Sequence, residues 1–381
     1  MLDRSCILFI AFLILTNLQY ILSQSSIGSA NCKPDTSRYD PRVTMSEWAK
    51  AGVEGGIPKP ELVKIKARLA PGDDLQDAIN SVAKSGGGVL LLSKGEYEIF
   101  STITLESGVT LRGTIKDSVL ISIKIHGYHF STGKPRQSAL FISNKHHVGI
   151  ENLTIKYTGT FFEPKDKDAL QTPWDKDVFH TPELRDTTLF VESIWFENSK
   201  NCWVRNCNIL WAGSDPIRIT NSEHITCTGN FIDRSYNKCD GGMGYYNIIN
   251  SKYVLVYYEH IKRIRHFAIQ NGSMYNVVMN NYLEVDINFH DGDGGYNLIE
   301  QNTIHIPQWH SWHCFQRGDP RQHQVPGKFN ILFRNVAHYK NGSFEFSNPD
   351  AVYEINSTWG GKNALETNIS IPESNTFYKL E

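Results

Sequence analysis

A short pattern of apolar residues around a bend asparagine recurs along this chain and constrains its fold more than any other feature. Clear copies are Val148 to Ile155 and Ile225 to Ile232, in which apolar residues alternate on both sides of Asn152 and Asn230. From Cys207 onward the equivalent positions are 207, 230, 259, 281, 302 and 335, spaced 21–29 residues apart with one interval of 33. This period is typical of a solenoid, in which each repeat forms one coil and buries its apolar face against the next coil.

The alternation within each copy predicts short strands whose inward residues stack from coil to coil. Asparagines at the bends are expected to pair with the asparagine of the next coil. The chain of 381 residues exceeds the usual size of one domain, but a repeat fold grows along one axis and escapes that limit. A β-propeller is the alternative, and its blades need longer repeats.

One helix is predicted ahead of the repeats. Leu75, Ala78, Ile79 and Val82 form a single apolar stripe, Asp73 or Asp74 can cap its start, and Gly86 follows its end. A glycine-rich strand, Gly86 to Leu92, comes next, followed by Gly95-Glu96-Tyr97 and Val109 to Gly113.

This opening, Gly72 to Gly113, resembles the pectin lyase-like superfamily, in particular its pectate-lyase-3 type. The resemblance implies an all-β fold, a single-stranded right-handed parallel β-helix with an N-terminal capping helix. It also implies an activity on acidic polysaccharides, because β-helix enzymes of this kind act mostly on such polymers.

The N-terminal sequence predicts that the protein is secreted. Residues 1–24 have the features of a secretory signal peptide, with an apolar run from Cys6 to Leu22 that ends at the small residue Ser23. A signal anchor is the alternative. The remaining chain divides into an irregular segment (25–70), the β-helix (71–343, with a long charged loop at 158–186) and a C-terminal cap or tail (344–381).

The composition limits the kinds of binding partner that can be expected. The net charge of −2 supports neither nucleic acid nor a membrane surface as a partner, and a monomer is expected. Asn-x-Ser/Thr sequons fit a secreted glycoprotein. An even number of cysteines after signal removal permits disulfides of undetermined pairing: Cys32, Cys202, Cys207, Cys227, Cys239 and Cys314.

Ionisable residues recur at a similar offset after each repeat position, so the solenoid is expected to align them in a polar ridge. The members are Ser214, Asp215, Arg218, Asn237, Lys238, Asp240, Arg265, His266, His290, Asp291, Asp293, His310 and His313. A merely solvated edge of polar turns is the bland alternative. The co-location of His266, His290 and His310 favours chemistry, because imidazole serves acid–base catalysis at neutral pH.

Elimination from a uronate needs a cation for the C6 carboxylate, a base for the C5 proton and an acid for the leaving oxygen. We predict Arg265, His266, His290 and Asp291 as catalytic residues, with either histidine as the base. The predicted substrate-binding residues are Lys238, Arg263, Trp309, His310, Trp312 and His313. Calcium is a possible cofactor at Asp240 and Asp293, although turn hydrogen bonds explain the Asp-Gly-Asp spacing equally well.

Three alternatives stay open. A glycoside hydrolase would use two of Asp215, Asp240, Asp291 and Asp293. The ordered motifs of polygalacturonases are absent, and so is the Arg-x-Pro-x-x-Arg motif of pectate lyases, which leaves the polysaccharide undetermined. A uronate C5-epimerase would share the proton abstraction, and a non-catalytic carbohydrate-binding solenoid would need only the fold.

Trp195, Trp203 and Trp211 are expected in the core or as stacked rungs.

Overall fold

The computed structural model describes residues 45–125, 137–159, 190–238, 243–306, 313–319 and 321–338, and the short stretches 352–355, 358–359, 362–363 and 376–378. The predicted signal peptide, most of the long loop and most of the C-terminal tail lie outside these residues. No helix in the described part of the chain is long and apolar enough to cross a membrane.

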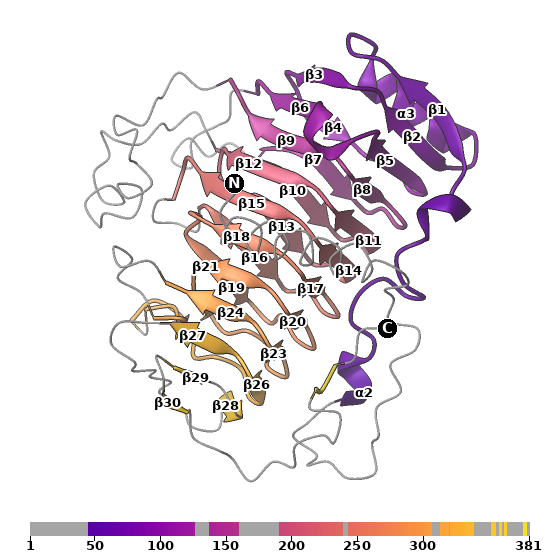
Figure 1. The fold of residues 1–381 in the computed structure, drawn as a ribbon. Coiled ribbons are helices and arrows are strands. Elements are labelled where there is room, and N and C mark those ends of the chain that lie inside the picture. Colours follow the sequence, from indigo (N-terminus) through magenta and orange to yellow (C-terminus); the bar gives the residue numbers. More distant parts are fainter. Residues whose placement is uncertain are drawn as a thin grey trace, which may run out of the picture.

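The strands form three sheets that wrap around one elongated core, and each coil contributes strands to these sheets in turn (Figure 1). The strands of each sheet are parallel, except for an antiparallel pair at the C-terminal end. We call the sheets A, B and C. Sheet A contains β1 (Ile65–Leu69), β2 (Gly88–Leu92), β5 (Val109–Gly113), β8 (Gly149–Glu151), β11 (Lys200–Arg205), β14 (Glu223–Thr228), β17 (Leu255–Tyr257), β20 (Val277–Met279), β23 (Leu298–Glu300), β26 (Asn330–Phe333) and β28 (Val352–Ile355).

Sheet B contains β3 (Gly95–Ile99), β6 (Val119–Ile123), β9 (Thr154–Tyr157), β12 (Asn208–Ala212), β15 (Phe231–Ser235), β18 (His260–Lys262), β21 (Tyr282–Glu284), β24 (Thr303–His305), β27 (Val336–His338), β29 (Thr358–Trp359) and β30 (Lys362–Asn363). Sheet C contains β4 (Ile103–Thr104), β7 (Gln137–Ser143), β10 (Val191–Glu197), β13 (Ile217–Thr220), β16 (Tyr245–Ile249), β19 (His266–Gln270), β22 (Ile287–His290) and β25 (Phe315–Arg317). The predicted parallel β-helix is confirmed.

Helix α3 (Leu75–Lys84) covers the end of the core beside β1 and β2, as the sequence predicts. Asp74 is its N-cap, and its carboxylate accepts a hydrogen bond from the N–H of Asp77 at 2.8 Å. Leu75, Ile79 and Val82 are buried against the first coils. Three shorter helical segments are α2 (Met45–Trp48), η3 (Pro60–Leu62) and η4 (Lys116–Ser118).

The bend asparagines form the predicted ladder between sheets A and B. The N–H of Asn281 donates to Oδ1 of Asn302 at 3.1 Å, and the N–H of Asn302 donates to Oδ1 of Asn335 at 3.0 Å. In one coil Glu259 takes the place of asparagine and accepts from Nδ2 of Asn230 at 2.5 Å. These bonds satisfy buried backbone groups that no strand partner reaches.

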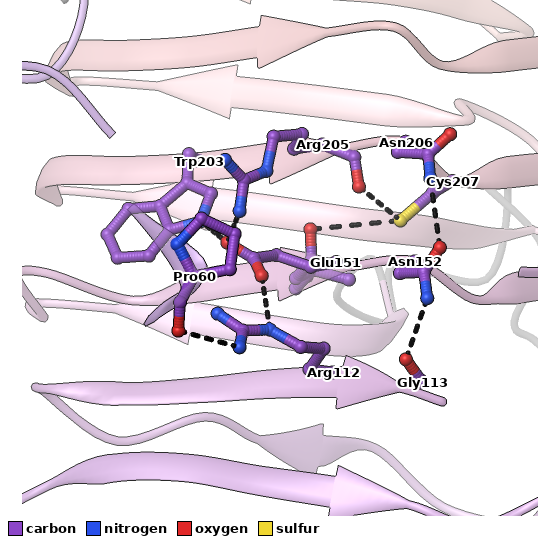
Figure 2. A network of polar contacts seen from close by, with 10 residues as sticks. Pro60, Arg112, Gly113, Glu151, Asn152, Trp203, Arg205, Asn206 and Cys207 are labelled. Carbon is purple, nitrogen blue, oxygen red and sulfur yellow. Dashed lines mark hydrogen bonds and ion pairs between the residues drawn. The ribbon is translucent and has the colours of Figure 1, made fainter. Parts of the chain in front are cut away.

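The outer face of sheet A holds a buried ion network (Figure 2). Glu151 is 2 % exposed and lies between Nε of Arg112 at 2.6 Å and NH2 of Arg205 at 2.7 Å. Its Oε1 also accepts from the indole N–H of Trp203 at 2.7 Å. Gly149 is required beneath that indole, because a Cβ there would lie 2.4 Å from the ring. The network fixes one part of sheet A around the buried carboxylate of Glu151.

Terminal segments meet on another part of sheet A. Trp48 packs edge-on against Phe377 at 5.9 Å, within an apolar cluster that includes strand residues of β17, β20, β23 and β26. The carboxylate of Glu300 accepts from the N–H groups of Phe377 and Tyr378 at 3.0–3.1 Å. The hydroxyl of Tyr378 donates to the carbonyl of Ala51 at 3.0 Å, which joins the two segments.

The four cysteines in the described residues are free thiols in the structure: Cys202, Cys207, Cys227 and Cys314. All four are buried in the core, and burial raises the pKa of each thiol above its ordinary value. They therefore serve as small apolar residues of the stack. Cys32 and Cys239 lie outside the described residues.

We predict that replacing Glu259 by glutamine stabilises the protein at neutral and alkaline pH. Burial raises the pKa of this carboxyl from 4.5 to about 8, so the folded chain keeps a proton that the unfolded chain releases above 4.5. The stability contribution of Glu259 is complete below pH 4.5 and is lost as pH rises toward 8, by about 1.4 kcal/mol per pH unit. Glutamine keeps the acceptor for Asn230 and cannot ionise.

Urea denaturation of wild type and Glu259→Gln at pH 4.5 and pH 8 tests this prediction. The variant should gain free energy of unfolding relative to wild type only at the higher pH. The exposed Glu61→Gln is the matched control and should show no such difference. An equal effect of Glu259→Gln at both pH values would contradict the assignment.

Candidate active site

Polar side chains gather on the outer face of sheet C. In β16, β19, β22 and β25 the alternate residues Tyr246, Phe267, Ile287 and Phe315 lie in the core and occupy paired positions in adjacent coils. Their neighbours along each strand therefore point outward. We call this outward set the sheet C cluster; its members are Tyr245, Asn247, His266, Ala268, Gln270, Asp286, Asn288, His290 and Gln316.

His266 and Asp286 form a buried pair in this cluster. The ring Nδ1 lies 2.8 Å from one carboxylate oxygen and 2.9 Å from the other, and the two residues are 5 % and 0 % exposed in turn. Nε2 of Gln316 donates to the same carboxylate at 2.6 Å. Because a carboxylate only accepts, it holds the ring proton on Nδ1 and leaves a lone pair on Nε2 of the neutral imidazole.

The second imidazole, His290, lies one coil further along the solenoid. Its ring centroid is 6.4 Å from that of His266 and 4.1 Å from that of His323. Both His266 and His290 lie edge-on to the ring of Tyr245, at 4.9 and 5.8 Å. Nδ1 of His290 is 2.9 Å from Oε1 of Gln270.

Burial keeps both imidazoles neutral. It lowers the pKa of His266 well below 6.5, and the guanidinium of Arg265 lowers it further. Burial is also the main cause that lowers the pKa of His290, to about 3, with smaller effects from His266, His323 and Arg265. A neutral imidazole with an accessible lone pair is the form that acts as a general base.

Arg265 belongs to this site. It immediately precedes β19, and its guanidinium lies 5.6 Å from the centre of the Tyr245 ring. Arg263, two residues earlier, adopts a left-handed backbone conformation and has NH1 3.6 Å from Asp233 on sheet B. Lys238 is buried, and its Nζ donates to the carbonyl of Ser235 at 2.5 Å. Through the ring of Tyr245, the guanidinium of Arg265 contacts the sheet C cluster.

Asp215 anchors the part of the site that precedes β16. It is fully buried and accepts from the N–H of Tyr245 at 2.8 Å, from Nδ2 of Asn247 at 3.0 Å and from NH1 of Arg218 at 3.1 Å. The guanidinium of Arg218 in turn lies 5.5 Å from the ring of Trp195. The outward face therefore continues over several coils beyond the two histidines.

The other predicted carboxylates stabilise turns. Oδ1 of Asp291 accepts from the N–H of Gln324 at 3.1 Å, and His323 is 3.7 Å from the same oxygen. Asp293 accepts hydrogen bonds from Gly295, Gly327, Asn297 and Asn330 at 2.8–3.0 Å. These contacts support the turn alternative for Asp293, since its oxygens already have donors.

Among the described residues, no group of three or more His, Cys, Asp or Glu side chains is arranged to hold a metal ion. Asp240, Trp309, His310 and Trp312 lie outside the described residues, so the calcium and sugar-platform predictions for them remain predictions. His313 lies two residues before β25, which begins at Phe315.

The predicted stacking register needs one correction. The sequence offset places His266 and His290 in one sector, 7 and 9 residues after the bend positions 259 and 281, whereas the strands pair Gln270 with His290 and bring Asp286 beside His266. The connection from β18 to β19 is one residue longer than that from β21 to β22, and β19 begins earlier in its coil. A constant offset from the bend therefore does not hold.

The sequence analysis also missed Asp286, Asn247, Gln270 and Gln316. Their signal lies in strand alternation: the run Val285-Asp-Ile-Asn-Phe-His290 places Asp286, Asn288 and His290 on one side and apolar residues on the other. Of the three tryptophans expected in the core or as stacked rungs, Trp203 is buried at 2 % exposure and Trp211 packs against Tyr236, with ring centroids 4.9 Å apart. Trp195 stacks with Phe141 at 5.1 Å on the outer face of sheet C.

We predict that His266 and His290 stay neutral in the folded protein from pH 8 to below pH 6. Nuclear magnetic resonance titration of labelled histidines should show no ionisation of these two rings in that interval, because burial lowers both pKa values. The same residues in urea should titrate near 6.5. A folded-state titration of either ring at or above 6.5 would contradict the described environment.

Solved structures with this architecture are known. A polygalacturonase from Erwinia carotovora ssp. carotovora is 14% identical, with a TM-score of 0.51 over 82% of this chain and 98% of that chain. A pectin methylesterase from Yersinia enterocolitica is also 14% identical, with a TM-score of 0.41 over 77% of this chain and 92% of that chain.

No known protein-family model matches the sequence, and no curated protein matches it. Identities this low show the fold alone. The chain therefore has a right-handed parallel β-helix fold, which it shares with the polygalacturonase structure.

Proposed function

We propose that this protein is an extracellular enzyme that cleaves an acidic, uronate-containing polysaccharide by β-elimination. The observation that carries the proposal is the pair of His266 and Asp286 on the outer face of sheet C, with Arg265 beside it. This pair supplies a neutral base in a fixed tautomer, and the adjacent guanidinium supplies a cation.

The chemistry follows from these groups. The guanidinium of Arg265 neutralises the C6 carboxylate of a uronate and so makes the C5 proton more acidic. Nε2 of His266 removes that proton, and the carboxylate of Asp286 stabilises the resulting imidazolium. The bond from C4 to the glycosidic oxygen then breaks and a C4–C5 double bond forms. The leaving oxygen takes a proton from the His266 imidazolium, which returns the base to its neutral form.

The polymer would lie across the strands of sheet C. Neighbouring parallel strands are roughly 4.8 Å apart, so a chain running along the solenoid meets a new outward side chain at each coil. Paired positions in adjacent coils carry Trp195, Arg218, Asn247, Ala268 and Asn288. An aromatic ring, a cation and two amides separated by a small residue suit a charged carbohydrate.

The described carboxylates give less support to a hydrolase. A paired-carboxylate mechanism needs two acids that reach the glycosidic bond from opposite faces. Asp215 and Asp293 are buried and accept three and four hydrogen bonds from protein groups, and Asp291 accepts one in a turn. We therefore retain β-elimination and expect a monomer that binds no nucleic acid.

We predict that His266→Ala lowers the release of unsaturated uronate by about 10²–10⁴-fold, the usual contribution of a general base. The assay follows the ultraviolet absorbance of unsaturated uronate and the appearance of reducing ends, on a panel of acidic and neutral polysaccharides. His260→Ala is the matched control, because His260 also pairs with a carboxylate, Glu284 at 3.1 Å, but on sheet B.

The control should retain wild-type activity. Reducing ends without absorbance in the wild-type protein would point to a hydrolase. No reaction on any polymer, together with measurable binding, would favour a carbohydrate-binding solenoid.

The pH profile gives a separate prediction. Elimination requires neutral His266, and its lowered pKa places the acidic fall of kcat/KM below pH 6.5. Arg265→Gln removes a cation that lowers this pKa, so the fall should move to higher pH even though the rate itself decreases. A wild-type midpoint at or above 6.5, or a shift to lower pH in the variant, would contradict the role of His266.

A further inference from the structure

We infer that Asp215 fixes the ring proton of His290 on Nδ1, acting across three coil intervals through the side-chain amides of Asn247 and Gln270. Asp215 precedes β13, Asn247 lies in β16, Gln270 ends β19 and His290 ends β22. The four side chains are linked in series by hydrogen bonds of 3.0, 2.6 and 2.9 Å. Asp215 and the two amides are positioning residues in this arrangement.

The direction of each bond follows from the first. A carboxylate only accepts, so Nδ2 of Asn247 must face Asp215 and its Oδ1 must face Gln270. Nε2 of Gln270 therefore donates to Asn247, which leaves Oε1 of Gln270 to face the imidazole. That oxygen accepts a hydrogen bond from Nδ1–H of His290. Nε2 of the neutral ring therefore carries the lone pair.

Burial makes this direction persistent. Asp215, Asn247 and Gln270 are 0 %, 1 % and 7 % exposed, so water does not readily replace either amide partner. Reversing one amide would place two donors or two acceptors face to face at about 3 Å, which leaves buried polar groups unsatisfied and is therefore unfavourable. The remaining charged or titratable groups around the ring are His266, His323, Arg265 and Asp291.

The inference gives the two histidines the same tautomer by separate routes. Asp286 contacts His266 directly, whereas Asp215 reaches His290 through two amides. Its catalytic consequence rests on the proposed function: His290 accepts a hydrogen bond from a sugar hydroxyl at Nε2, and does not protonate the leaving oxygen.

Nitrogen-15 magnetic resonance of the substrate-free protein at neutral pH tests the inference without any assay of activity. In wild type, both His266 and His290 should show a protonated Nδ1 and an unprotonated Nε2. In Asp215→Ala, the acceptor that orients Asn247 is removed. The direction of the chain is then no longer fixed, and His290 should show a mixture of tautomers.

Asp286→Ala is the crossed control, because it removes the acceptor beside His266. It should give a mixture of tautomers at His266 and leave His290 unchanged, while Asp215→Ala should do the opposite. Should Asp215→Ala fail to fold, Asn247→Ala interrupts the same chain, with the same mixture expected at His290.

A protonated Nε2 on His290 in wild type would overturn the inference. An unchanged tautomer of His290 in folded Asp215→Ala and Asn247→Ala would overturn it as well. Either result would leave the proposed elimination by His266 untouched. Conversely, an inactive protein with the expected tautomers would reject the proposed function and keep this inference.

Discussion

The parallel hydrogen bonding between coils is the constraint on which the rest of this structure depends. It sets side chains of successive coils directly above one another, so each residue must be compatible with the residues at the paired positions of the adjacent coils. The core shows this in the stacked rings of Tyr246 and Phe267, 4.6 Å apart. The same register brings His266 next to Asp286, although twenty residues separate them along the chain.

Stacking also determines how the protein handles buried polar groups. At the bends, asparagine amides satisfy backbone donors of the previous coil, and serine hydroxyls do the same at another bend, as between Ser222 and Ser251 at 3.0 Å. On sheet C, equivalent stacking links side chains to side chains and ends at imidazoles. In both places a low dielectric makes an unpaired group costly, so the orientation of one member dictates that of the next. The difference is that the sheet C chains end in groups able to exchange protons.

The fold could be predicted from the sequence because its signals are local and repeated. The capping helix follows from Leu75, Ile79 and Val82, and the coils follow from the spacing of the bend residues 207 to 335. The site was predictable only in part. His266 and Arg265 were identified, but a fixed offset could not locate their partners, because connections between strands differ in length from coil to coil.

Asp286 shows why the remainder could not be predicted. Its sequence context is an ordinary alternating strand, and its importance comes from pairing with another coil, which no local pattern encodes. Trp195 shows the same limit in another way. An aromatic residue within a strand is as compatible with the core as with the outer face until the register of its coil is known, and its neighbour Phe196 is the one that lies inside.

The central claim is that His266 and Asp286 promote elimination at a uronate, and product mass tests it most directly. Oligosaccharides released by the purified protein from an acidic polymer would be analysed by mass spectrometry. Elimination predicts fragments whose new non-reducing end is unsaturated and one water lighter than the corresponding hydrolysis product. Fragments at the full hydrolytic mass would contradict the account and assign the cleavage to an attacking water.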